Sequence, residues 1–225
     1  MKLIRFVPST GINSSVGVPQ PAKNFVPGWW KKGELELSTG DPGMKACIPF
    51  LDVLISGYML VTPFDIFVTK NEDGTQNIRW NAPDGWEGFI GERPVELGST
   101  IPRPAGHSPN GMVWSSKWGW KTPRGWSTIV THPYNHHDLP FTTLSAYMDS
   151  DKYYNYGNIP FFIKEDFEGR IVAGTPFAQV IPVKRASWKS MIDFGLSNTA
   201  IRQGSITRDN EHFYKKFLWV KKVYR

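Results

Sequence analysis

Proline and glycine punctuate this chain from end to end. Its 225 residues include 18 prolines and 21 glycines, which divide most of it into short segments. Proline removes a backbone donor and glycine weakens regular elements, so this spacing favours short strands joined by turns over long helices. Hydrophobic residues make up 40% of the chain and charged residues 20%, a balance that supports a packed core. We therefore expect a mainly β globular protein.

Composition also narrows the classes of protein. The single cysteine, Cys47, excludes an internal disulfide and a cysteine-based zinc cage, and it fits a reducing compartment. No apolar stretch approaches the roughly 20 residues of a membrane span, so no membrane partner is expected. The net charge of +6 and the pI near 9.3 favour anionic partners such as nucleotides, nucleic acids or acidic protein surfaces.

Three regions differ in their sequence pattern. Residues 1–45 are rich in proline, glycine and serine, and predict an irregular arm. Residues 46–190 hold the expected β domain, in which Pro49 opens a short apolar helix over residues 47–55. Residues 126–131 alternate with the period of a strand.

Residues 191–225 form a basic, aromatic extension, predicted to be a short helix or tail. Phe213, Phe217, Val220 and Tyr224 fall on one face of a helix and are flanked by lysines. The extension either docks on the core of its own chain or binds a partner or phosphate groups. Both interpretations stay open.

Three groups of side chains are candidates for chemistry. Asp149 and Asp151 follow an apolar segment, where a carboxylate either accepts a proton from water or caps a turn. Gln179 lies in a predicted strand, where it either binds a ligand or satisfies backbone groups. His132 and His136 lie on a proline-containing loop and are interpreted as phosphate contacts when protonated, as metal ligands or as ordinary turn residues.

The order of these motifs over residues 122–185 resembles the dUTPase and dCTP-deaminase family. The segments that carry the resemblance are residues 122–126, 146–151 and 174–181. The resemblance implies a β-clip fold, a distorted antiparallel barrel or jelly roll, and association as a homotrimer.

The resemblance also assigns roles. Asp149 matches the aspartate that orients the water attacking the α-phosphate, with Mg²⁺ on the triphosphate. Asp151 belongs to the same hairpin, and Tyr153 would pack against the sugar. Gln179 matches the glutamine that helps to hold the phosphates.

The chain departs from the family where phosphates are bound. The loop at residues 131–138 replaces the family's Arg-Ser-Gly motif, Pro176 replaces a basic residue, and the glycine-rich C-terminal arm is absent. We therefore expect a degenerate site that binds a nucleotide-like or other anionic ligand, without efficient hydrolysis. It would use Asp149, Asp151, Tyr153, Gln179, His132 and His136, with no metal ligands among them.

Two alternatives remain. Through residues 21–32 and 47–50, the whole chain resembles proteins encoded by bacteriophages for which no activity is known. One alternative is thus a phage structural, decoration or assembly protein, located in the virion rather than in the host cytoplasm. The other is an unorthodox nucleoside-triphosphate pyrophosphatase, for which Mg²⁺ would be the cofactor. Whether the protein is an enzyme, and whether its tail contacts nucleic acid, stay open.

Overall fold

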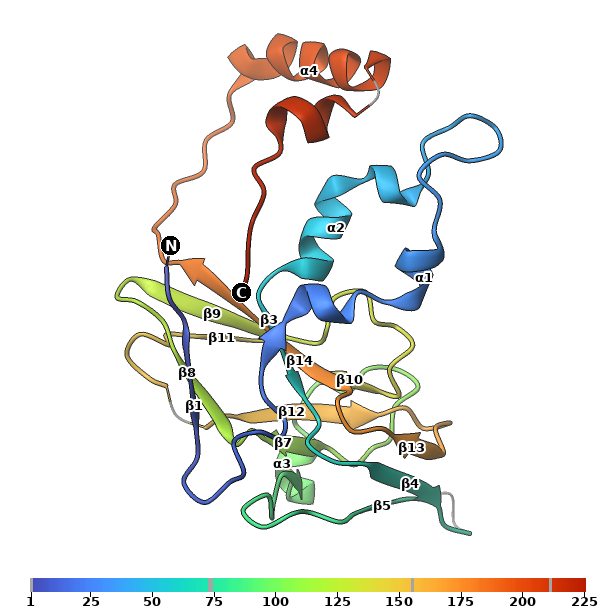
Figure 1. Ribbon diagram of the computed structural model, residues 1–225, viewed down its shortest axis with the longest axis vertical. Helices are drawn as coiled ribbons and strands as arrows, with labels where there is room; N and C mark the ends of the chain where they lie inside the picture. The colour runs from blue at the N-terminus through green and yellow to red at the C-terminus, as the bar shows by residue number, and fades with distance from the viewer. Residues whose placement is uncertain (1, 73–74, 155, 211) are drawn as a thin grey trace.

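The computed structural model describes residues 2–72, 75–154, 156–210 and 212–225 (Figure 1). Strands account for 30% of residues and helices for 19%, and the strands form several antiparallel sheets, none of which is closed. The expected mainly β fold is therefore confirmed. We call residues 2–184 the body and residues 185–225 the C-terminal arm, because the arm projects from the sheets of the body.

A five-stranded sheet organises one side of the body. Its strand order is β11-β9-β14-β3-β2, and all four pairings are antiparallel. The central strand β14 is the longest, and its register shifts between Pro176 and Ala178 where it pairs with β3. The strands span Ala146–Met148 (β11), Trp126–Thr131 (β9), Pro176–Lys184 (β14), Tyr58–Val61 (β3) and Gln20–Pro21 (β2).

Three smaller sheets complete the body. A four-stranded sheet has the order β10-β12-β7-β6, a three-stranded sheet has the order β13-β4-β5, and β1 pairs with β8. The four-stranded sheet contains Phe141–Thr143 (β10), Asn158–Ile163 (β12), Met112–Ser115 (β7) and Ile90–Glu92 (β6). The others contain Gly169–Ile171 (β13), Ile66–Lys70 (β4), Gln76–Trp80 (β5), Arg5–Pro8 (β1) and Trp118–Lys121 (β8).

Aromatic side chains fill the main hydrophobic core. Trp114 on β7 is fully buried and stacks on Phe161 of β12, with ring centroids 3.7 Å apart. Phe141 and Phe177 contact the same indole ring, so strands of two different sheets meet at this residue. Burial of large aromatic rings is the strongest apolar contribution to a core of this kind.

Short helices lie at the edge of the body. Helix α2, Ile48–Ile55, has Pro49 in its first turn, which confirms the predicted apolar helix. The expected irregular arm at residues 1–45 contributes β1 and β2 to the sheets of the body. The remaining helices of the body are η1 (Ala22–Phe25), α1 (Gly28–Lys32), η2 (Met44–Ala46) and α3 (Val95–Gly98).

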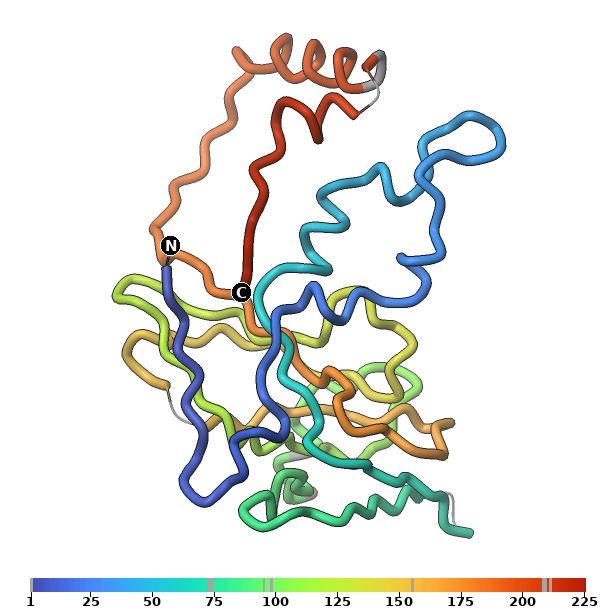
Figure 2. The backbone as a smooth tube through the Cα atoms, in the orientation of Figure 1, coloured from blue at the N-terminus to red at the C-terminus, as the bar shows by residue number. Residues whose placement is uncertain are grey.

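The C-terminal arm leaves the body after β14 and returns to it (Figures 1 and 2). Its outgoing leg is extended up to η3, Phe194–Leu196, and α4, Ser197–Asp209, follows. A π-helix, η4, spans Tyr214–Leu218, and residues 219–225 run back extended. The predicted helix face thus ends at Leu218, so Val220 and Tyr224 lie outside any helix. Within the described residues, every helix is too short or too polar to cross a bilayer.

Candidate functional site

The two acidic residues of the predicted hairpin bind one arginine. Asp151, whose side chain is 4% exposed, makes paired bonds of 2.6 and 2.5 Å with the guanidinium of Arg185. The same guanidinium lies 3.0 Å from Asp149, and the backbone N–H of Gly125 donates to Asp151. The acidic turn after β11 is therefore tied to the end of β14, where the C-terminal arm begins.

This arrangement keeps both carboxylates ionised. The hydrogen bond from Arg185 holds the pKa of Asp151 well below its usual range, and the bond from Ser127 lowers the pKa of Asp149. The pair in turn raises the pKa of Arg185. A carboxylate that already shares its charge with a guanidinium is a weak proton acceptor, so the structure gives Asp149 little basicity toward water.

Gln179 has its side-chain amide fully engaged inside the protein. It is completely buried, and its amide donates to the carbonyls of Val53, at 3.0 Å, and Ser56, at 2.7 Å. Its carbonyl oxygen accepts from the backbone N–H of Tyr134 at 2.9 Å. The glutamine therefore joins the end of α2 and the histidine loop to β14.

The histidine loop is also held by internal bonds. His132 Nδ1 accepts from the backbone N–H of Thr143, so its Nε2 donates to the carbonyl of His136. Burial lowers the pKa of His132 to about 4 and also lowers the pKa of His136. Both imidazoles are thus neutral near pH 7. Among the described residues, no group of three or more potential ligands is arranged to hold a metal ion.

The predicted site residues therefore fall into two separate clusters within one chain. Gln179 and the histidine loop lie near one end of β14, and the acidic turn lies at the other, beside Arg185. Gln179 and Arg185 are six residues apart along extended chain, which corresponds to about 20 Å. Tyr153 lies beside the acidic turn, where its backbone N–H donates to the carbonyl of Asp149 and its side chain is 58% exposed.

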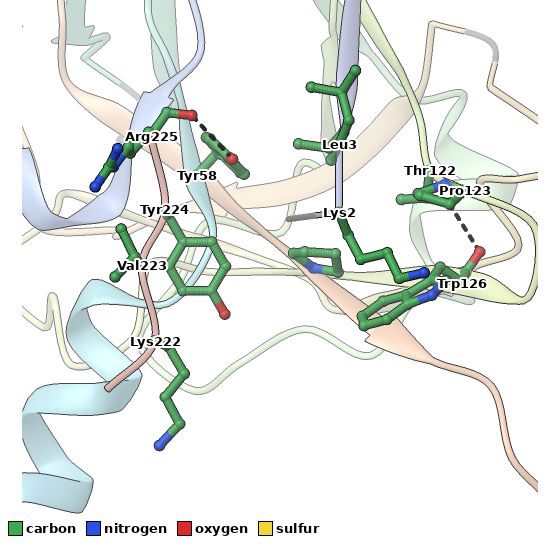
Figure 3. Close-up of a pocket in the computed structure, with 12 residues that line it drawn as sticks. Lys2, Leu3, Tyr58, Thr122, Pro123, Trp126, Lys222, Val223, Tyr224 and Arg225 are labelled. Carbon is green, nitrogen blue, oxygen red and sulfur yellow. Dashed lines mark hydrogen bonds between the residues drawn. The ribbon is translucent and has the colours of Figure 1, made fainter. Parts of the chain in front are cut away.

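A cavity of about 250 Å³ lies where the two chain ends meet the five-stranded sheet (Figure 3). Trp126 and Tyr224 form facing parts of its wall, and the side chain of Lys2 reaches toward the indole. Tyr58 packs edge-on against Tyr224 and donates from its hydroxyl to the carbonyl of Arg225. The cavity joins aromatic walls to basic side chains, which is a suitable environment for a planar anion.

Comparisons with known proteins add no family. No protein-family model matches the chain, and no curated protein matches it.

Sequence reasoning missed Arg185 and the cavity at the chain ends. Arg185 follows directly on β14, but only the pairing β11-β9-β14 brings it to the acidic residues. The cavity takes its aromatic rings from β3, β9 and the C-terminal tail, which are far apart in sequence. The basic and aromatic composition of the tail was the one available signal.

Proposed function

We propose that this protein is a homo-oligomeric structural or assembly protein whose C-terminal arm packs on a neighbouring copy. The observation that carries the proposal is the outgoing leg, residues 186–196. Trp188, Met191, Ile192 and Phe194 on this leg are 81–89% exposed. Single exposed apolar residues are common, but a contiguous group of this kind marks an interaction surface.

Helix α4 supports the same proposal. None of its described side chains is buried, and Ile201 is 67% exposed. An isolated helix of this length is marginal in water, and Gly204 and the β-branched residues weaken it further. Packing on another chain supplies the tertiary contacts that such a helix needs.

Charge does not oppose contact between the outgoing leg and the body of a second copy. The leg carries one lysine and one aspartate, so it has no net charge. Residues 2–184 contain 17 basic and 17 acidic residues, so the body has no net charge either. Contact between two whole arms would instead bring positive charges together, which opposes association.

The proposal includes a fold class for the body and an oligomeric state. We assign the body to the β-clip class and the assembly to a trimer, supported by the short antiparallel strands and by the resemblance of residues 122–185 to trimeric enzymes. The resemblance to phage-encoded proteins supports a role in a virus particle or its assembly. We do not assign nucleotide hydrolysis to this protein, because both carboxylates of the acidic turn are already bound to Arg185.

Light scattering coupled to gel filtration tests this function on the full chain of 25.6 kDa. We expect the wild type to elute as an oligomer and the triple variant Trp188→Ser, Ile192→Ser, Phe194→Ser to elute as a monomer. The matched control changes three half-exposed apolar residues of the body: Leu35→Ser, Leu37→Ser and Phe67→Ser. The control should keep the wild-type mass. A monomeric wild type, or an arm variant of unchanged mass, would overturn the proposal.

A further inference from the structure

The net positive charge of this protein comes entirely from the C-terminal arm. Residues 185–225 contain nine of the 26 basic residues and three of the 20 acidic ones, which accounts for the whole net charge of +6. Within the arm, the return leg, residues 212–225, has five basic residues and no acidic one. A segregated cluster of this kind is the electrostatic signature of a polyanion-binding surface.

The basic side chains of the return leg are mostly available to a ligand. Lys215, Lys216 and Lys221 are exposed and form no ion pair with any described residue. Lys222 is bound to Asp52 of α2 at 2.5 Å, and Trp219 donates to the same carboxylate. These two bonds hold the leg against the body and fix its position.

Aromatic residues are interspersed with the lysines of the return leg. Five of the fourteen residues of the return leg are aromatic. Phe217 is 70% exposed and packs on Phe213, with ring centroids 5.0 Å apart. Exposed rings among lysines provide stacking surfaces next to phosphate-binding charges, the combination by which proteins bind single strands.

Two cavities flank the end of the return leg. One, of about 250 Å³, contains Lys2 and the rings of Trp126 and Tyr224. The other, of about 290 Å³, lies on the side of Lys23 and Lys221. The described residues that line them include no aspartate or glutamate, so both are basic.

We propose that the return leg binds single-stranded nucleic acid. Lys215, Lys216 and Lys221 contact successive phosphates, and one unstacked base enters the cavity between Tyr224 and Trp126, next to Lys2. A duplex keeps its base faces stacked and offers only phosphates to this surface, so the aromatic cavity selects the single strand. The inference is independent of the proposed oligomer, because it rests on the return leg rather than on the outgoing leg.

Fluorescence anisotropy with labelled oligo-dT and oligo-U of about 15 nucleotides, measured over a range of salt concentrations, tests the inference on the full chain. The variant Lys215→Gln, Lys216→Gln, Lys221→Gln should bind more weakly. Its plot of log K against log salt should be shallower by about 2, since each lost phosphate contact on a single strand removes about 0.7. The control variant Lys31→Gln, Lys32→Gln, Lys70→Gln removes equal charge from exposed sites on the body and should keep the wild-type slope.

A matched pair at Tyr224 tests the cavity. Tyr224→Leu removes the ring and should weaken binding about tenfold, whereas Tyr224→Phe keeps the ring and should bind like the wild type. Light scattering on the same samples shows whether the oligomeric state is unchanged. A loss of nucleic-acid binding can therefore be distinguished from a loss of the proposed oligomer. Stronger binding to oligo-dT or to oligo-U assigns the site to DNA or RNA.

Three results would overturn the inference. One is the absence of binding at low salt, and another is an unchanged salt slope in the return-leg variant. The third is equal affinity for duplex DNA or for vesicles of anionic lipid, combined with no effect of Tyr224→Leu. That result would show that the leg recognises charge alone.

Discussion

The body and the C-terminal arm use the same kinds of residue in opposite ways. Trp114 in the body is fully buried among aromatic rings, whereas Trp188 in the arm is 89% exposed. The body is electrically neutral, whereas the arm carries the net charge of the protein. The body therefore buries most of its large aromatic side chains in its own core, and the arm leaves its apolar side chains exposed. From this difference we infer that the body provides the stability of the protein and that the C-terminal arm provides its interactions.

The largest expected effect compares these two tryptophans. Trp114→Ala should lower the free energy of unfolding by about 3–5 kcal/mol, because it leaves a cavity beside Phe161. Trp188→Ala should change it by no more than about 0.5 kcal/mol in dilute protein, where the arm has no partner. Urea denaturation measures both. A large effect of Trp188→Ala in a dilute monomer would show that the arm belongs to the folded core. That result would contradict the division between a stabilising body and an interacting arm.

The next effect concerns pH and the half-buried His132 of the body. Because the pKa of His132 is about 4 in the folded protein and near 6.5 when unfolded, the unfolded chain binds the proton first as the pH falls. The preference of the folded protein for neutral His132 therefore stabilises the fold fully above pH 6.5. This stability, on the order of 3 kcal/mol, is lost progressively between about pH 6.5 and 4.

Thermal denaturation over that pH range measures this loss. His136, whose pKa burial also lowers, adds to it in the same direction. The variant His132→Gln should flatten the pH dependence. If His132→Gln keeps the wild-type pH dependence, the imidazole is not kept neutral by the fold.

A third comparison uses two glutamines. Gln179→Leu should cost about 2–3 kcal/mol, because it leaves the N–H of Tyr134 and the carbonyls of Val53 and Ser56 without their buried partner. Gln203→Leu in α4 changes an exposed side chain and should be nearly neutral. The midpoints of urea denaturation of the two variants measure this difference in stability. Equal midpoints would mean that Gln179 does not hold the histidine loop and α2 together.

Much of the local structure could be predicted because local signals agreed with the final packing. Pro49 before an apolar run predicted α2 correctly, because the first turn of a helix tolerates a residue without a backbone donor. The alternating residues 126–131 gave β9. Alternation did not predict that Ser127 and Thr128 are both buried, since neighbouring Asp149 and Trp120 supply their hydrogen-bond partners.

The candidate site was harder to predict, because a side chain's role depends on distant neighbours. Asp149 and Asp151 followed an apolar segment as expected, but Arg185 reaches them only across two strand pairings. Gln179 was assigned to a strand correctly. Its choice between ligand and backbone depended on where α2 and the histidine loop end, and no local pattern contains that information.

The sequence by itself determined a mainly β protein with a basic, aromatic C-terminal end, since residue spacing and charge are local properties. Tertiary structure alone decided that this end becomes an out-and-back arm, and that its return leg lies beside Lys2 and Asp52. It also decided that both carboxylates of the acidic turn pair with Arg185. The physical reason is that burial and ion pairing depend on contacts between segments far apart in the chain, which strand order creates.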